Sequence, residues 1–321
     1  MTRFVLRRLA ASFLLLYLVL TATFFLLHLA PGSPADLMME GQRVSAEHRE
    51  NLRRIYGLDR SLPEQYVLWL GAVARGNWGM SFSWQRPVAT VILDALPATL
   101  LLASAALVIQ YAAGVSLGIA AARRRGRAAD HLIRIGSLLL YSQPTFWLGL
   151  MAILLFSLAW PVLPAGHMRS VGAEDLAPAA RLLDLLRHLA LPCLVLGLTE
   201  AGATARFVRS NLLEVLGQEY IRAARAKGLS ERRVVWMHGL RNILPLLLQL
   251  LALSVSGLLS GSLVTEVIFS WPGLGRLAFE SILSRVYPMV LATTAFTVLV
   301  LACNLVADIL HALADPRVRD A

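Results

Sequence analysis

Charged residues are scarce in this sequence of 321 residues: 16% are Asp, Glu, Lys or Arg, whereas 57% are hydrophobic. Soluble globular domains carry about 25% charged and roughly 45–50% apolar residues. The polar residues are therefore too few to cover a water-soluble chain of this length. Instead, apolar runs longer than about 18 residues recur, which is typical of membrane-spanning helices. The composition excludes an ordinary cytosolic enzyme, a disordered chain and a disulfide-rich scaffold.

Lysine is almost absent, because 29 of the 30 cationic residues are Arg and only Lys227 is Lys. No basic stretch is interleaved with aromatic residues, as binding of single-stranded nucleic acid requires. The sequence also has no GxxxxGK[ST] phosphate-binding loop. We therefore expect no nucleic-acid partner and no cofactor in this chain.

Cysteine is equally rare. Cys193 and Cys303 lie far apart, each inside an apolar run, so we interpret them as small buried hydrophobic residues, with a disulfide or a metal pair as the minor alternative. The seven His residues are scattered and show no spacing typical of zinc sites. No Ser, His and acid stand out on a water-facing segment. We predict no metal site and no catalytic residue.

The apolar runs predict an all-α membrane protein with six transmembrane helices. The first run exceeds 20 residues, too long for most secretory signals, with a cleaved signal as the alternative. Pro97 is expected in the first turn of the second helix, and Gln143-Pro144 interrupts the third. The fourth helix is the weakest, because it contains Pro192, Gly197 and Glu200. The approximate bounds are 4–29, 95–122, 133–160, 189–208, 244–269 and 289–313.

The distribution of charge predicts the orientation of these helices. If the N-terminus is cytoplasmic, the inside segments hold 18 of the 30 cationic and 8 of the 20 acidic residues. The net charge is then +10 inside and zero outside. This asymmetry follows the positive-inside rule, so both termini are predicted to be cytoplasmic.

Two long loops carry further structure. Residues 30–94 are predicted to form an external segment of short helices packed over the first span. In the internal loop at about 209–243, an apolar stripe predicts one short amphipathic helix, formed by Leu213, Leu216, Tyr220 and Ala224. Gly228 suits a left-handed helix stop and Ser230 a helix N-cap. Such a pair of helices either lies on the lipid surface or docks into a partner.

Ordered sequence blocks narrow the choice. EYIRAARAKGLS at 219–230 precedes Arg241-Asn242 and Pro245; the other blocks are APG at 30–32, YGLD at 56–59, GNWGMS at 76–81, PTFWLG at 144–149, FSWPGLGR at 269–276 and DPR at 315–317. Together they resemble ABC importer permeases of the dipeptide, oligopeptide and nickel branch, with 219–230 similar to the cytoplasmic coupling loop. The chain departs from the family at Arg222, where the general motif has Glu, and at Asn77, where Asp is common.

The resemblance implies a type I ABC importer permease in the bacterial cytoplasmic membrane. Its divisions would be a first helix at 1–30, an external segment at 31–94 and a five-helix core at 95–321. The implied partners are a second similar permease, two P-loop ATPase subunits and an external solute-binding protein. ATP hydrolysis would reside in the ATPase, which is expected to contact the coupling residues Glu219, Tyr220, Ala223, Ala224, Lys227 and Gly228.

Polar residues inside the predicted spans are candidates for the translocation path, since such groups usually face a bundle interior or water. The candidates are Gln143, Pro144, Glu200 and Asn304. A structural role is the alternative for three of them: satisfying freed backbone for Gln143, pairing with Arg206 or a position near the inner interface for Glu200, and bonding between helices for Asn304. An external loop is expected at Trp271, Pro272 and Gly273, braced by Glu266.

The predicted function is therefore a pore-forming subunit of an ATP-driven importer, and di- or oligopeptides are the favoured cargo. Nickel or another small solute is the alternative cargo. A secondary transporter that uses Glu200 for ion coupling is the alternative mechanism, and a membrane enzyme is a third class.

Overall fold

The structure is a computed structural model, and it describes residues 2–29, 59–81, 84 and 86–283. These residues are almost entirely helical, and a two-stranded antiparallel hairpin joins Met80 to Pro87 and Ser81 to Arg86. In chain order the main elements are α1 (Thr2–Leu29), α4 (Leu62–Ala74), β1 (Met80–Ser81), β2 (Arg86–Pro87), α5 (Val88–Arg123), α6 (Ala128–Ser142), α7 (Thr145–Ile153), α8 (Pro178–Leu216), α9 (Glu219–Ala226), α10 (Glu231–Arg233), α11 (Arg241–Ile268) and α12 (Leu274–Leu283). Two π-helical segments, Leu154–Ala159 and Val234–Leu240, extend α7 and lead into α11.

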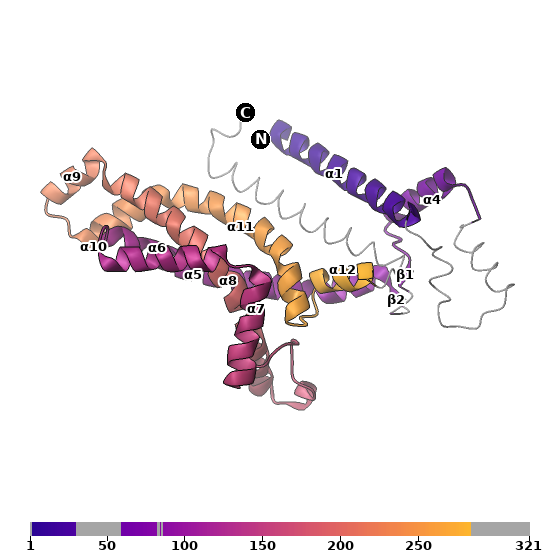
Figure 1. The fold of residues 1–321 in the computed structure, drawn as a ribbon. Helices are drawn as coiled ribbons and strands as arrows, with labels where there is room; N and C mark the ends of the chain where they lie inside the picture. Colours follow the sequence, from indigo (N-terminus) through magenta and orange to yellow (C-terminus); the bar gives the residue numbers. More distant parts are fainter. Residues whose placement is uncertain (1, 30–58, 82–83, 85, 284–321) are drawn as a thin grey trace.

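Three long helices, α5, α8 and α11, lie side by side and form the centre of the described structure (Figure 1). Glycines permit the close approach of α5 and α8. A Cβ atom on Gly114 would lie 2.6 Å from the Cβ of Thr204, and one on Gly118 would lie 2.6 Å from the Cβ of Val208. A Cβ on Gly197 would approach the α5 backbone in the same way. Small residues at helix contacts are typical of membrane proteins, where close packing replaces the hydrophobic effect as the driving force.

Three described helices are long and apolar enough to cross a membrane: α5, α8 and the helical stretch Glu231–Val255. α1 contains a shorter apolar stretch, Leu9–Ala22. The predicted helices at 4–29, 95–122, 189–208 and 244–269 therefore correspond to α1, α5, α8 and α11, and the predicted sixth span at 289–313 lies outside the described residues.

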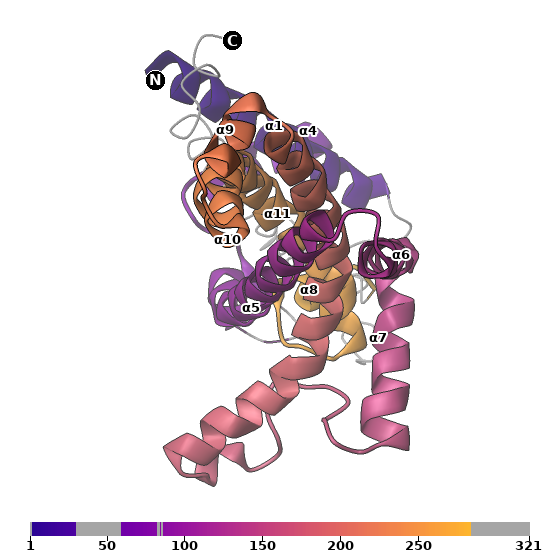
Figure 2. The same cartoon turned by 90° about the vertical axis from the view of Figure 1, so that its left-hand side faces the viewer.

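The third predicted span is divided into two helices at its predicted interruption. The helical break predicted at Gln143-Pro144 is present, but the helices on its two sides, Ala128–Ser142 and Thr145–Ala159, meet at 98°. Pro has no backbone N–H and favours an extended residue before it, and Gln143 is extended, with φ −84° and ψ 140°. α7 consequently turns away from α6, as Figure 2 shows. The resulting pair is either a broken span or a re-entrant loop.

Pro97 is also placed differently from the expectation. It lies inside α5 instead of in the first turn, because α5 begins at Val88. Val88 is fully buried, and it packs with Val91 of α5 and Leu274 of α12. This apolar cluster stabilises the helical turns of α5 that precede the predicted start at residue 95, and it holds α12 against them.

Within residues 31–94, the part that the structure describes packs on the first helix, as predicted. Tyr66 and Trp69 of α4 lie against Phe24 of α1, each with ring centroids 5.3 Å from the Phe24 ring. The hydroxyl groups of Thr21 and Tyr66 are 2.7 Å apart and share a hydrogen bond. Ser61 begins α4 with a capping box that includes Glu64.

Candidate functional site

The candidate coupling segment follows the end of α8. That helix ends at Leu216, and after Gly217-Gln218 the chain turns into α9 (Glu219–Ala226). Gly228 has φ +80°, the left-handed conformation predicted from the sequence. The Leu229 N–H donates to the Ala224 carbonyl at 3.3 Å, and the Gly228 N–H donates to the Arg225 carbonyl at 2.9 Å. These bonds close the end of α9 as in the Schellman motif.

The predicted apolar stripe does not form one helix, so this prediction was wrong. Leu213 and Leu216 belong to α8, whereas Tyr220 and Ala224 belong to α9. Gly217 separates the two helices and changes the direction of the chain, which breaks the helical spacing on which the stripe depended. Tyr220 is 46% exposed instead of packed.

The buried face of α9 is formed by Ile221, which is fully buried, and Ala224, which is 7% exposed. α9 contacts the π-helical segment Val234–Leu240. The Asn242 side-chain amide also donates a hydrogen bond to the Tyr220 hydroxyl at 3.1 Å. Since Asn242 lies in the first turn of α11, α9 is held by its buried face and tied to the next long helix.

The opposite face of α9 is exposed. It consists of residues spaced by three and four positions, Glu219, Arg222, Ala223 and Ala226, and exposed Lys227 follows them. Of the two small residues predicted to allow close approach of a partner, Ala223 therefore faces outward and Ala224 inward. The Glu219 carboxylate accepts a hydrogen bond from Arg222 at 2.7 Å, with both side chains mostly exposed. Such pairs contribute about 0–1 kcal/mol, so either charge can exchange its partner.

An ion pair that the sequence analysis missed lies near this segment. Arg209 of α8 donates two hydrogen bonds to Asp130 of α6, at 2.6 and 2.8 Å, and the Gly126 N–H donates a third at 3.0 Å. Asp130 is 1% exposed. The pair joins the turn between α5 and α6 to the C-terminal part of α8. An acid within an Arg-rich segment was the signal, but the partner, 79 residues away, could not be identified from it.

At the other end of α11, the predicted external loop is built around a buried carboxylate. Glu266 is fully buried, and its Oε1 accepts a hydrogen bond from the Thr99 hydroxyl at 2.8 Å. Its Oε2 accepts one from the Arg276 N–H at 3.0 Å. Gly273 packs so closely that a Cβ there would lie 2.4 Å from the carboxyl group. The expectation that Glu266 braces this loop is confirmed at the level of contacts.

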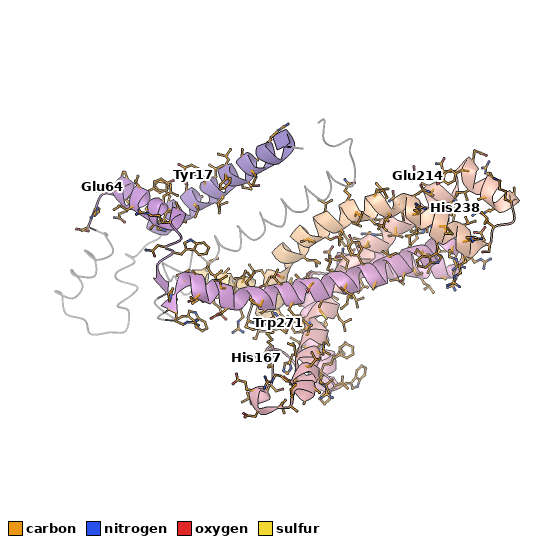
Figure 3. All side chains as sticks on the ribbon, turned by 180° about the vertical axis from the view of Figure 1, so that it is seen from behind. Tyr17, Glu64, His167, Glu214, His238 and Trp271 are labelled. Carbon is orange, nitrogen blue, oxygen red and sulfur yellow. The ribbon has the colours of Figure 1, made fainter. Side chains whose placement is uncertain are left out.

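Trp271 fixes the loop against α5. It is fully buried, its indole N–H donates to the Ala98 carbonyl at 2.8 Å, and its backbone N–H donates to the Glu266 carbonyl at 2.8 Å. The preceding Ser270 has φ +50°, and its carbonyl accepts a hydrogen bond from Arg276 at 2.7 Å. Figure 3 shows Trp271 between α5 and the segment that carries His167, away from Glu214 and His238 near α9.

Of the predicted path residues that the structure describes, Gln143 and Pro144 lie together at the break between α6 and α7, and Glu200 lies in α8. Gln143 and Glu200 are both partly buried, and Pro144 is exposed. The Arg206 guanidinium lies 4.8 Å above the Tyr141 ring, and the ion pairs found among the described residues do not include Glu200, so the alternative that Glu200 pairs with Arg206 was wrong. Asn304 lies outside the described residues, and a role in the path stays a prediction for all four residues.

A buried polar cluster between the three central helices was also missed. Gln110 of α5 is 2% exposed, and its side-chain amide donates to the hydroxyls of Thr204 in α8 and Ser254 in α11, both at 3.0 Å. A glutamine inside the apolar run of the second predicted helix was the available signal. Among the described residues, no group of three or more His, Cys, Asp or Glu is arranged to hold a metal ion.

With this geometry in view, the comparisons with known proteins identify the family. Residues 114–320 match the sequence profile of the binding-protein-dependent transport system inner membrane component, and residues 1–103 match that of its N-terminal region. The chain belongs to this family. As a membrane permease component of ABC importers it is not itself catalytic, and the ATPase is a separate subunit.

Curated relatives of this permease cover its whole length. It is 40% identical to the di/tripeptide transport system permease protein DppB of Pseudomonas aeruginosa and 37% identical to the oligopeptide transport system permease protein AppB of Bacillus subtilis. It is 34% identical to the dipeptide transport system permease protein DppB of Escherichia coli K12. Each comparison covers 99% of both chains.

A solved structure of the MetNI methionine ABC transporter in an inward facing conformation is similar in fold. The TM-score is 0.54 at 17% sequence identity, over 71% of this chain and 97% of the MetNI chain. At this identity the likeness concerns the fold alone, and it agrees with the all-α permease architecture predicted from the sequence.

Proposed function

We propose that this permease forms the translocation path of an ATP-driven importer for di- or oligopeptides. The names of the three relatives described above, at 34–40% identity over the whole chain, support this class of cargo. The complete transporter would contain a second similar permease, two P-loop ATPase subunits that bind ATP and magnesium, and an external solute-binding protein. Nickel or another small solute is the alternative cargo.

The exposed face of α9 is the observation that carries the mechanical part of this proposal. A helix transmits force only if it is held on one side by its own bundle and on the other by the partner. Ile221 and Ala224 provide the first contact, whereas Ala223 and the charged groups of Glu219 and Arg222 remain available for the second. We infer that this face docks on the ATPase and passes its movement through Asn242 into α11.

The proposed orientation follows from the charge distribution. With both termini in the cytoplasm, α9 lies inside and the loop between α11 and α12 lies outside, at two well separated places along the bundle (Figure 1). The division into a first helix at 1–30, an external segment at 31–94 and a core at 95–321 is part of the same proposal. We place Gln143, Pro144, Glu200 and Asn304 along the path, because irregular or polar positions within spans usually border protein or water.

Reconstitution of the complete transporter into vesicles tests this proposal. Uptake of a labelled dipeptide should require ATP, the ATPase subunits and the external binding protein, and omission of any of them should abolish it. Ionophores that dissipate ion gradients should leave uptake unchanged. Uptake that persists without ATP and collapses with the ionophores would instead favour a secondary transporter that uses Glu200.

A further inference from the structure

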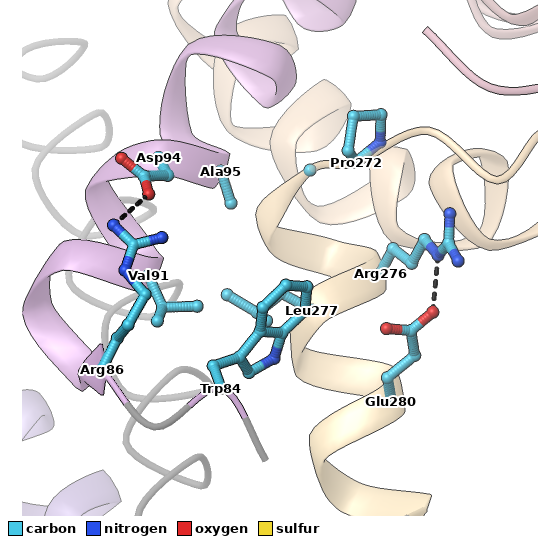
Figure 4. A pocket seen from close by; sticks show the side chains of 10 residues that line it. Trp84, Arg86, Val91, Asp94, Ala95, Pro272, Arg276, Leu277 and Glu280 are labelled. Carbon is cyan, nitrogen blue, oxygen red and sulfur yellow. Dashed lines mark hydrogen bonds and ion pairs between the residues drawn. The ribbon is translucent and has the colours of Figure 1, made fainter. Parts of the chain in front are cut away.

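A cavity of 260 Å³ lies at the start of α5, far along this helix from α9. Figure 4 shows that its two walls come from different parts of the chain. Arg86 of β2 and Asp94 of α5 form one wall, whereas Arg276 and Glu280 of α12 form the other. The volume is slightly below the roughly 300–1,000 Å³ typical of small-molecule sites, so the cavity suits a ligand of about dipeptide size.

Each wall carries one cation and one anion. Arg86 and Asp94 are 2.8 Å apart, and Arg276 and Glu280 are 2.6 Å apart. Their side chains are 30–62% exposed, and exposed pairs of this kind contribute little to stability. The Arg86–Asp94 pair, which has the more exposed side chains, can therefore open towards a ligand at small cost. Because the two cations and two anions balance, the site favours a ligand that carries both signs over a simple anion or cation.

The remaining lining is apolar. Val91 and Leu277 lie between the charged walls, and the Trp84 side chain is 54% exposed beside them. A large exposed aromatic ring next to an apolar surface provides contact area for an organic side chain. The site thus combines partners for an ammonium group, partners for a carboxylate and a surface for an apolar group.

The α12 wall is held firmly in place. The backbone N–H of Arg276 bonds to the buried Glu266, and its guanidinium bonds to the Ser270 carbonyl. The Leu274 N–H bonds to the Thr99 hydroxyl at 2.8 Å. A site whose walls are fixed before binding loses less conformational entropy when a ligand enters.

We propose that this cavity is a subsite of the permease for a zwitterionic short peptide. The peptide ammonium group bonds to Asp94 or Glu280, its carboxylate bonds to Arg86 or Arg276, and an apolar side chain packs on Trp84. This assignment rests on the proposed function, since it takes the cargo to be a peptide. It adds that the permease contacts the peptide ends directly, at the outer end of the path.

The test is photolabelling of the membrane complex of the two permeases and two ATPase subunits in nanodiscs, without the external binding protein. The probe is alanyl-benzoylphenylalanine, a dipeptide that carries a photoreactive side chain. We expect saturable labelling within residues 84–95 or 272–280, which unlabelled dialanine prevents. The variant Asp94→Asn/Glu280→Gln removes both partners of the ammonium group, and it should raise the half-competing dialanine concentration about tenfold or more, as the loss of a charge-assisted hydrogen bond predicts.

Two matched variants control for charge and folding. Asp59→Asn/Glu174→Gln removes the same number of charges from exposed positions outside the cavity, and it should leave labelling unchanged. Asp94→Glu/Glu280→Asp keeps both charges and should retain labelling. N-acetyl-dialanine amide, which lacks both charged ends, should compete poorly, and glycerophosphoethanolamine tests whether a lipid headgroup is the true ligand.

Labelling that is unchanged in Asp94→Asn/Glu280→Gln, or equal competition by the blocked peptide or the headgroup, would overturn the subsite. Uptake by the complete transporter separates this failure from that of the proposed function. Loss of the expected labelling while dipeptide uptake remains intact contradicts the subsite alone. Absence of both contradicts the proposed cargo as well.

Discussion

Arg209 and Asp130 form a two-point ion pair that joins α8 to the start of α6, with nitrogen–oxygen distances of 2.6 and 2.8 Å. Asp130 is buried and only one-fifth of the Arg209 side chain is exposed. Removal of one partner from a buried pair costs about 3–5 kcal/mol, because the other charge is left uncompensated.

Arg209→Ala should therefore lower the thermal unfolding temperature of the purified transporter by several degrees. Asp130→Asn/Arg209→Gln should destabilise it less than the sum of the two single variants, because neither charge remains buried alone. Arg86→Gln is the control, since it breaks a pair with exposed side chains that contributes about 0–1 kcal/mol. Equal losses of stability for Arg209→Ala and Arg86→Gln would contradict this interpretation.

The second prediction concerns the loop around Glu266. Gly273→Ala would place a methyl group 2.4 Å from the Glu266 carboxyl group, so the loop or the carboxylate must move. Overpacking of this kind typically costs about 1–3 kcal/mol, and proteolysis between α11 and α12 should become faster. Gly257→Ala is the matched control, because nothing lies within 4 Å of that position. Resistance to proteolysis equal to that of the control would show that the loop tolerates the displacement.

The third prediction concerns the turn after α9. Gly228 has φ +80° whereas Gly217 has φ −83°. A side chain in the left-handed conformation costs roughly 1–2 kcal/mol, so Gly228→Val should destabilise the turn and re-aim α10. Solute-stimulated ATP hydrolysis should fall in this variant, although the protein still inserts and assembles. Gly217→Ala should retain full stimulation of ATP hydrolysis. Loss of stimulation in Gly217→Ala together with full stimulation in Gly228→Val would contradict the role assigned to the turn.

A fourth prediction tests the orientation. Val171, which is fully exposed in the loop between α7 and α8, should react from outside the cell with a membrane-impermeant maleimide after substitution by Cys. Ser230→Cys, at the start of α10, should react only after the membrane has been permeabilised. Labelling of Ser230→Cys in intact cells would reverse the orientation inferred from the Arg distribution.

The features that the sequence predicted correctly depend on local chemistry. The break at Gln143-Pro144, the left-handed Gly228 and the N-cap position of Ser230 follow from the residues themselves. The 98° angle at the break does not, because it depends on how α6 packs on α8. There a Cβ on Gly202 would lie 2.5 Å from the Ser137 carbonyl, a contact between residues far apart in the chain.

In the candidate site, too, the local features could be predicted from the sequence, whereas the contacts between distant residues could not. The block at 219–230 identified the coupling segment, but the exposed face could be assigned only once the end of α8 was known. Ala223 and Ala224 are adjacent and have the same side chain. The position at which α8 ends, at Gly217, decides which of the two faces outward. The bonds of Gln110 to Thr204 and Ser254 likewise join three separate helices, and a single sequence gives no information on that pairing.

The most direct test of the central claim is solute-stimulated ATP hydrolysis by the reconstituted transporter that carries Ala223→Glu. This change adds a bulky charge to the outward face of α9 and leaves its buried face intact. Ala128→Glu is the matched control, placed on an exposed position at the start of α6. We predict that Ala223→Glu reduces stimulated hydrolysis and uptake towards the unstimulated level, whereas the control retains both. Full stimulation and uptake with Ala223→Glu would contradict the assignment of α9 as the element that couples this permease to its ATPase.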